Sequence, residues 1–472
     1  MTERVSVSSL SRRGLFGTAA GVAATVALAA CGSSSESGSS STTTSGGSDP
    51  ASIATDAYVF GYPLVLMDAT RATAAPTNTL LRYNKTPSPD DKTVVTPNVD
   101  TLYSQAWLDL RTEPMVLQIP AMTDRYWLAQ ILDAWSNTAH NPSSVRPQIS
   151  SGDPSGPFTY AVTGPGWSGT LPDGLTRLDM PTATAWAIIR FALNDPDDHG
   201  AVTALQNQIK LMPLSTWTSA PDTPTPTGIP ADRTASPTKQ VAAMDGATFF
   251  AKLCTLMAAD APAPADADTL TRFATLGITP GGSLTGIDTG TLAAAVQSAQ
   301  QQIKDYKNPD AKIVNGWTYA TNLGTYGTDY SLRANTALTT LGANLPDDTL
   351  YPIMNNIPAD SGGPTHSYRI HFPAGQLPPA DAFWSLTAYT ADHFLVPNPD
   401  NIYSLGHHPT VTPNPDGSVD LTLAPANPGP DVPVGNWLPI PTSGTFNLAL
   451  RLYAPHTSAA DGHWQPPALT AA

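Results

Sequence analysis

Residues 101–110 read TLYSQAWLDL, and this stretch alternates in the way expected of a half-buried β-strand. One face carries Leu102, Ser104, Ala106, Leu108 and Leu110, and the other carries Tyr103, Gln105, Trp107 and Asp109. Further strand-like segments follow at short turn spacing, namely MVLQI (115–119), RYWLAQILDAW (125–135), FTYAVTGP (158–165) and TAWAIIRFAL (184–193). The spacing predicts antiparallel β structure over residues 93–193, arranged as a sandwich or a barrel.

Helical patterns lie on either side of this block. ASIATDAYVFGYPLVLMDATR (51–71) is apolar on nearly all sides, which predicts a buried helix over 51–72 that Pro63 kinks or splits. DDHGAVTALQNQIKLMPL (197–214) predicts another helix, and 246–344 is mostly helical in pattern. Strand patterns return past residue 350, in YRIHF (368–372), FWSLTAY (383–389), SVDLTLA (418–424) and FNLALRLY (446–453).

The predicted fold is therefore mainly β with a helical middle region. It consists of an N-terminal antiparallel β-sandwich and a C-terminal, jelly-roll-like antiparallel β domain. The expected boundaries are 51–215 for the N-terminal helix and sandwich, 216–345 for the helical connecting region and 346–472 for the C-terminal β domain. The formal net charge of −15 argues against a protein that binds nucleic acid through a basic surface.

The first residues have the pattern of an export signal. Residues 11–16 (SRRGLF) form a twin-arginine motif, a short apolar run follows, and residues 28–31 (LAAC) resemble a lipobox. We therefore expect a signal peptide over 1–30, a lipid on Cys31 and a flexible Ser/Gly/Thr tether over 31–50. This predicts a protein exported by the twin-arginine route and anchored on the outer face of the cytoplasmic membrane. The alternative is an ordinary cleaved signal with a chance cysteine.

The second cysteine, Cys254, lies in the apolar helical pattern FFAKLCTLMAA, which indicates a core residue and not a nucleophile. With Cys31 assigned to the lipid, no disulfide within the chain is expected.

One phrase occurs twice, as TPNVDTLYS (96–104) and VPNPDNIYS (396–404). Proline, asparagine and aspartate at the entrance to a strand usually build the turn itself, because the Asn and Asp side chains bond to nearby backbone. The alternative is that each corner presents a carboxylate and a phenol to one cleft. We expect such a cleft for the first copy, around Asp100 and Tyr103, and a purely structural corner for the second copy, around Asp400. The repeat is compatible with internal duplication and with coincidence.

Aromatic and polar side chains gather near the first copy. Aromatic rings beside amides and carboxylates are typical of sites for sugars or aromatic ligands. Arg190, in an apolar strand, is expected to be half-buried and paired with one of the nearby aspartates. The alternative is a satisfied buried polar network. The residues of the candidate pocket are Asn98, Asp100, Tyr103, Gln105, Trp107, Arg125 and Asp133.

Two classes of function fit these residues. The first is a membrane-anchored protein that binds a small polar, aromatic or carbohydrate-like ligand in a cleft of the β domains. The second is a cell-envelope hydrolase that uses Asp100, Tyr103 and Arg125. The sequence lacks a G-x-S-x-G elbow, an H-E-x-x-H motif and a C-x-x-C motif. We expect no cofactor, and no metal either, because the histidines gathered between 366 and 463 include no H-x-H pair.

Several longer motifs resemble a known pair of families. They are AYVFGYPLVLM, VVTPNVDTLYSQAWLDL, DRYWLAQILDAWSNT, FWSLTAYTADHFLVPNPDNIYSLG, NWLPIP and LRLYAP. In this order they are similar to the bacterial families called domain of unknown function 1254 (N-terminal) and domain of unknown function 1214 (C-terminal), over residues from about 55 to 467. The resemblance implies a β-sandwich, a helical middle and a jelly-roll-like C-terminal domain. It implies no catalytic role for any residue.

Overall fold

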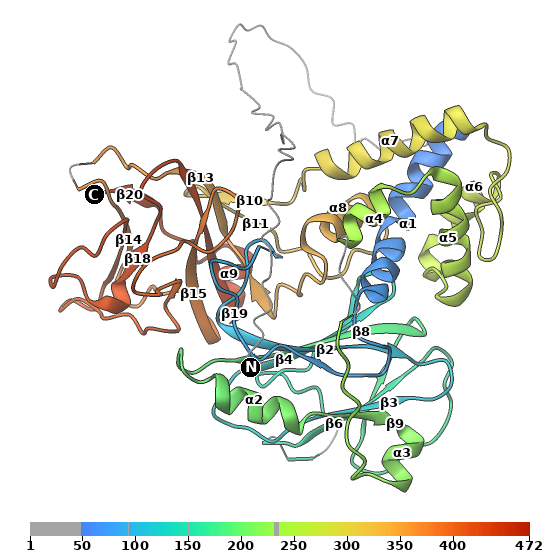
Figure 1. Ribbon diagram of the computed structural model, residues 1–472, viewed down its shortest axis with the longest axis horizontal. Helices are drawn as coiled ribbons and strands as arrows, with labels where there is room; N and C mark the ends of the chain where they lie inside the picture. Colours follow the sequence, from blue (N-terminus) through green and yellow to red (C-terminus); the bar gives the residue numbers. More distant parts are fainter. Residues whose placement is uncertain (1–48, 93, 150–151, 154, 231–235, 364) are drawn as a thin grey trace, which may run out of the picture. The chain divides into compact units, whose positions relative to one another are not determined.

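The computed structural model describes residues 49–92, 94–149, 152–153, 155–230, 236–363 and 365–472, which all fall in one structural unit (Figure 1). The predicted signal peptide, the lipidation site Cys31 and nearly all of the tether lie outside these residues. No helix within the described ranges is both long and apolar enough to cross a membrane.

The first helix, α1 (Pro50–Ala72), is the centre of the helical region. Asp49 caps it by accepting hydrogen bonds from the amides of Ala51 and Ser52. Its apolar side chains are buried on nearly every side, as predicted. The helix continues through Pro63, so the predicted split is absent. Around it pack α4 (Pro237–Ala242), α5 (Gly246–Ala259), α6 (Ala267–Ala274), α7 (Thr289–Asp305) and α8 (Tyr330–Thr340), and Figure 1 shows α7 crossing the upper end of α1.

The N-terminal β domain consists of two facing sheets. One has the order β1 (Leu81–Arg82), β2 (Thr101–Asp109), β8 (Thr184–Ala192), β4 (Trp127–Asp133) and β5 (Thr138–His140). The other has the order β7 (Thr176–Asp179), β6 (Phe158–Thr163), β3 (Met115–Ile119) and β9 (Lys210–Pro213). Apolar residues of both sheets form one core, which includes Leu102, Leu108 and Trp127. The predicted strand at 101–110 is therefore confirmed, and the face of β2 that carries Leu102 and Leu108 lies in this core.

One predicted helix is shorter than expected. Helix α2 (His199–Gln208) covers only the first part of 197–214, and residues Lys210–Pro213 form β9, which pairs antiparallel with β3. Ile209 and Leu211 lie in the sandwich core on either side of Lys210, so the burial of alternate residues favours a strand over a further helical turn. The short helix α3 (Leu214–Ser219) follows directly.

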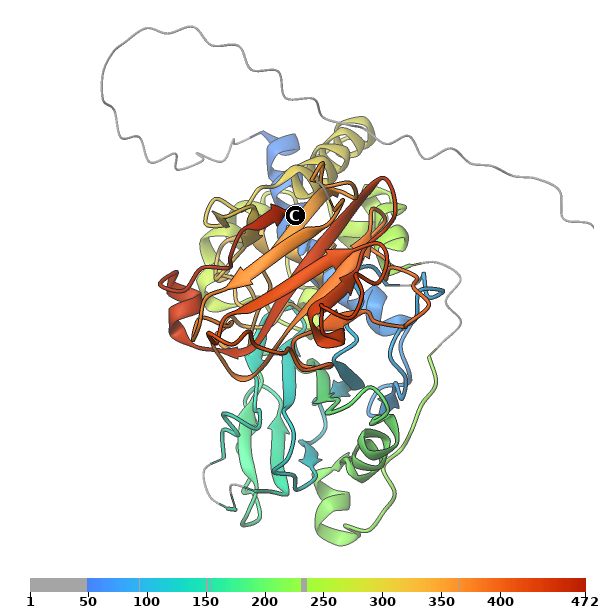
Figure 2. The same ribbon diagram turned by 90° about the vertical axis from the view of Figure 1, so that its left-hand side faces the viewer.

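The C-terminal β domain also has two sheets that enclose a core. The larger contains β10 (Lys312–Val314), β11 (Trp317–Tyr319), β13 (Ile353–Pro358), β19 (Thr445–Pro455), β15 (Ala380–Thr390) and β16 (Ser404–Leu405), with β12 (Thr349–Leu350) also paired to β19. The smaller contains β18 (Trp437–Pro439), β17 (Val419–Ala424), β14 (Tyr368–Phe372) and β20 (Leu469–Ala471). Figure 2 shows the long strands of this domain lying alongside one another in orange and red.

The mainly β fold with helices between two largely antiparallel domains is thus confirmed, and each domain has one parallel pair, β6 with β7 and β17 with β18. The expected domain boundaries need two adjustments. Helix α1, expected in the same domain as the N-terminal sandwich, packs in the helical region. Strands β10 and β11 lie inside the range 216–345, which was expected to be helical, yet they extend the larger C-terminal sheet. Trp317, in β11, is fully buried in the core of that domain, which explains why this segment joins the sheet.

Candidate ligand-binding site

A cavity of about 590 Å³ lies where the N-terminal sheet, the end of α8 and the C-terminal sheet meet. We call it the central pocket. Its wall includes side chains of β2 and β8, the segment 94–98, the residues from Thr339 to Asn344 and residues of the C-terminal domain, among them Tyr351 and Arg451. Its size is within the range of about 300–1,000 Å³ that is usual for small-molecule sites.

The register of β2 and β8 determines one wall of the central pocket. Tyr103 lies opposite Arg190, and Trp107 lies opposite Trp186. The two indole rings are stacked, with centroids 5.0 Å apart and planes 4° apart. Trp107 is buried behind this wall at 2% exposure, so the predicted pocket residue Trp107 supports the site without lining it.

Gln105 belongs to the pocket and is held by two neighbours. Its carbonyl oxygen accepts a hydrogen bond from Nε1 of Trp186 at 3.0 Å, and its amide nitrogen donates to the hydroxyl of Tyr83 at 3.0 Å. These bonds fix the side chain in one orientation. The aromatic wall therefore carries an amide of defined direction.

Arg190 is 7% exposed and lines the pocket. It donates from Nη1 to the side-chain oxygen of Gln130 at 3.0 Å, and its guanidinium lies 5.3 Å from the ring centroid of Tyr103. Among the described residues it forms no ion pair with a carboxylate. The expected pairing of Arg190 with an aspartate is therefore wrong.

Arg451 enters the pocket from the C-terminal domain. It is 4% exposed, and its three hydrogen bonds go to the hydroxyl of Thr387 (3.1 Å), the carbonyl oxygen of Thr96 (3.1 Å) and the hydroxyl of Tyr389 (2.7 Å). Its guanidinium also lies 5.6 Å from the ring centroid of Tyr351. Burial raises the pKa of Tyr351, so this phenol stays protonated at neutral pH.

The first copy of the repeated phrase forms a corner, and only some of its residues line the pocket. The side-chain oxygen of Asn98 accepts from the amides of Asp100 (2.6 Å) and Thr101 (3.3 Å), which is the predicted turn chemistry. The amide nitrogen of Asn98 donates to the hydroxyl of Tyr453 at 2.7 Å. Asn98 lines the pocket, whereas Asp100 does not.

Asp100 is buried behind the pocket, at 6% exposure. Its carboxylate accepts hydrogen bonds from the hydroxyls of Ser385 (2.6 Å), Ser404 (3.1 Å) and Tyr453 (3.3 Å). Ser404 belongs to the second copy of the phrase, so the two copies meet at this carboxylate. The carboxylate therefore binds the N-terminal domain to strands β15, β16 and β19, and a ligand in the central pocket does not reach it directly.

The second copy is the structural corner that was expected. Asn398 donates to the carbonyl oxygens of Val396 and Ile402 and accepts from the amide of Ile402. Asp400 is exposed. The corner closes through its asparagine and leaves the carboxylate in solvent.

Arg125 lies in a different place, which corrects the predicted cluster. Its guanidinium donates to Asp198 at 2.5 Å and to the carbonyl oxygen of Ala192 at 2.7 Å. It lines a separate cavity of about 460 Å³, together with Phe383 and His407. Asp100, Tyr103 and Arg125 therefore do not converge on one cleft, because the turn before β4 directs Arg125 towards the start of α2.

Asp133 is also outside the central pocket. It ends β4, and its carboxylate accepts from the amides of Trp135 and Asn137 and from the Asn137 side chain. Burial raises the pKa of Asp133 to about 6, against these hydrogen bonds. Its role in the structure is to close a turn.

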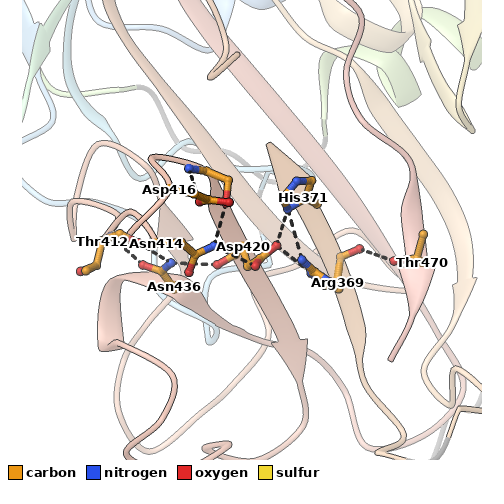
Figure 3. A network of polar contacts seen from close by, with 9 residues as sticks. Arg369, His371, Thr412, Asn414, Asp416, Asp420, Asn436 and Thr470 are labelled. Atoms are coloured by element: carbon orange, nitrogen blue, oxygen red, sulfur yellow. Dashed lines mark hydrogen bonds and ion pairs between the residues drawn. The ribbon is translucent and has the colours of Figure 1, made fainter. Parts of the chain in front are cut away.

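The histidines are divided among several surroundings. His407 stacks on Phe383 with ring centroids 3.9 Å apart, and burial lowers its pKa to about 4, so the ring is neutral. His371 instead pairs with Asp420 at 2.7 Å in a network on the smaller C-terminal sheet, where Arg369 and Asn414 bind the same carboxylate (Figure 3). Within the described ranges, no group of three or more His, Cys, Asp or Glu side chains is placed to hold a metal ion.

Several pocket residues escaped the sequence analysis, and Arg451 is the clearest of them. It lies in FNLALRLY, where the leucines face the C-terminal core, and a charged residue between them on the opposite face was a signal of a second buried surface. Tyr351 and the segment 339–344 lie in loops or at a helix end, where periodicity carries no information.

Comparison with known proteins supports this architecture. Residues 77–213 match the family described as "Protein of unknown function (DUF1254)", and residues 358–457 match "Protein of unknown function (DUF1214)". Both regions are shorter than the span from about 55 to 467 over which the resemblance was expected. No curated protein matches the chain.

Two solved structures resemble it. The VPA0106 protein from Vibrio parahaemolyticus matches with a TM-score of 0.67 at 20% identity, over 89% of this chain and 99% of that chain. A putative uncharacterized protein from Burkholderia cenocepacia matches with a TM-score of 0.41 at 17% identity, over 91% of each chain. At 20% identity the first likeness concerns the fold alone. With both regions in the expected order, the chain belongs to the proteins that carry an N-terminal DUF1254 region followed by a C-terminal DUF1214 region.

Proposed function

We propose that this protein binds a small molecule with an apolar or aromatic body in the central pocket. The observation that carries the proposal is the pocket itself, a cavity of about 590 Å³ that combines apolar side chains with a few oriented polar groups. Trp186, Ile188 and Leu341 offer apolar surface, and Gln105 offers a fixed amide. This composition is typical of small-molecule sites, in which apolar surface provides affinity and few polar groups provide orientation.

The hydrolase alternative receives less support. It needs Asp100, Tyr103 and Arg125 around one substrate, but the first is covered by three hydroxyls and the third is paired with Asp198 beside another cavity. A general base must lie within hydrogen-bond reach of the proton that it removes. A binding function needs no such arrangement.

The place of action is a separate part of the proposal. The LAAC motif at 28–31 and the Ser-rich tether favour a protein that a lipid on Cys31 anchors to the outer face of the cytoplasmic membrane. Replacement of Cys31 by alanine should release the protein from the membrane fraction in its native host. Wild-type protein recovered without lipid and fully soluble would contradict the anchor and leave the pocket proposal untouched.

The pocket is tested with N-phenyl-1-naphthylamine, a neutral aromatic dye whose fluorescence rises in apolar surroundings. The full chain should bind this dye at one site. Ala320 lines the pocket, so Ala320→Trp should fill part of it and lower the affinity at least about tenfold. Ala247→Trp, on the exposed face of α5, is the matched control and should bind as the wild type does. Equal binding by both folded variants would refute the proposal.

A further inference from the structure

We propose that the ligand of the central pocket is a monocarboxylate, and that Arg190 and Arg451 hold its carboxylate while its apolar body lies against Trp186. This inference rests on the proposed function and adds the chemical class of the ligand.

The two arginines are the first part of the argument. Both line the pocket, and they are 7% and 4% exposed. A guanidinium stays charged at any ordinary pH, and burial of a charge is costly unless an opposite charge or several hydrogen bonds compensate it. Among the described residues, neither arginine has a carboxylate within ion-pair distance.

Their present partners leave donors for a ligand. The acceptors are the amide oxygen of Gln130 for Arg190, and two hydroxyls and one carbonyl oxygen for Arg451. All of these are neutral, and each guanidinium has five N–H groups. A carboxylate in the pocket would provide the opposite charge and accept from these side chains at once.

The two carboxylates whose charge acts on these arginines, Asp348 on Arg190 and Asp100 on Arg451, are hydrogen-bonded to other side chains. Asp348 accepts from Arg146 at 2.7 Å and from Asn141 at 2.5 Å. Asp100 accepts from Ser385, Ser404 and Tyr453. The described residues of the pocket wall include Lys85 and the two arginines but neither aspartate nor glutamate. In a chain with a net charge of −15, a cavity whose charged lining residues are all cations indicates an anionic ligand.

The rest of the wall favours a carboxylate over a phosphate ester. Trp186, Ile188 and Leu341 provide apolar surface beside the arginines. A phosphate ester carries up to two charges and loses more hydration on entering such a wall than a carboxylate does. Arg190 comes from β8 and Arg451 from β19, so the carboxylate would also join the N-terminal and C-terminal domains.

The test compares two ligands of the same shape, 2-naphthoate and the neutral 2-naphthamide, as competitors of N-phenyl-1-naphthylamine on the full chain. The carboxylate should displace the dye at a concentration at least about tenfold lower than the amide, because charge-assisted hydrogen bonds are formed only with the anion. Equal potency of the two compounds would overturn the carboxylate assignment while dye binding still supported the proposed function. Failure of the dye and of both compounds to bind would remove the proposed function itself.

Substitutions of single arginines test which side chains cause the preference for 2-naphthoate over 2-naphthamide. Arg190→Met and Arg451→Met should each remove most of the advantage of 2-naphthoate over 2-naphthamide, with both compounds measured against the dye affinity of the same variant. Arg333→Met is the matched control, because Arg333 is 3% exposed and lies among Phe60, Trp135 and Tyr330, away from the pocket wall. An advantage that persists in both pocket variants would refute the assignment. A rise in the wild-type melting temperature with 2-naphthoate but not with 2-naphthamide checks the same point without variants.

Discussion

The repeated phrase provides a matched pair of substitutions, Asp100→Ala and Asp400→Ala. The two aspartates occupy the same place in the phrase, but one is 6% exposed and binds three hydroxyls, whereas the other is exposed. Removal of the Asp100 carboxylate leaves the buried hydroxyls of Ser385, Ser404 and Tyr453 without this acceptor. Because a hydrogen bond to a charged group contributes about 1.5–3 kcal/mol and the three are not additive, we expect a loss of about 3–5 kcal/mol in the free energy of unfolding.

Asp400→Ala should change the free energy of unfolding by less than about 0.5 kcal/mol, as usual for an exposed position. Asp100→Asn should fall between the two, because the amide keeps one acceptor oxygen but loses the charge. Urea unfolding followed by tryptophan fluorescence measures all three, and the midpoints are compared at equal slope. Similar midpoints for Asp100→Ala and Asp400→Ala would show that the buried carboxylate does not join the domains and would refute the reasoning.

Three further results follow from the structure. Partial burial of Asp420 opposes its charge, but hydrogen bonds from Arg369, His371 and Asn414 outweigh this effect and lower its pKa to about 2. The carboxylate therefore stabilises the fold above its unfolded pKa near 3.8, and this contribution is lost as the pH falls towards 2. Asp420→Asn should cost roughly 1 kcal/mol at pH 7 after solvent screening and should weaken the loss of stability at acidic pH, as measured by urea unfolding at several pH values. A Cβ added at Gly61 would lie 2.4 Å from Cδ2 of Leu253. Overpacking in Gly61→Val should therefore reduce the free energy of unfolding by about 1–3 kcal/mol and lower the melting temperature. Gly200→Val, where open space surrounds the added atom, should have a smaller effect. Cys254 is 1% exposed and burial raises its thiol pKa, so it should react with a thiol reagent only after unfolding; rapid reaction of the native chain would contradict the core assignment.

Local patterns were sufficient for most of the fold. The period-two alternation at 101–110 predicted both the strand and its buried face, and the apolar run at 51–71 predicted a buried helix. The errors occur where a segment pairs with a strand that is far away in the sequence. Residues 210–213 pair with β3, and 312–319 extend the C-terminal sheet, because backbone pairing with a strand far along the chain outweighs the local helical pattern.

The site was less predictable for the same physical reason. Asn98, Tyr103 and Gln105 were found because they share a strand entry and one strand face. Arg125 was added wrongly, since nearness in sequence does not determine where a long side chain points after a turn, and here it reaches Asp198. Asp100 was assigned to the cleft because its partners, Ser385, Ser404 and Tyr453, lie some 300 residues further along the chain.

The buried arginines show what information was missing. In sequence, Arg190 is an unusual cation in an apolar strand, and the ordinary expectation is that a nearby carboxylate pairs with it. The structure instead places Arg451, from the other domain, in the same cavity wall, and among the described residues neither arginine has a carboxylate within ion-pair distance. The carboxylate proposed for the pocket would supply the opposite charge within hydrogen-bond reach that these guanidinium groups lack. Under this proposal the stability of the chain should increase with the concentration of the carboxylate, because a ligand that binds only the folded chain stabilises it.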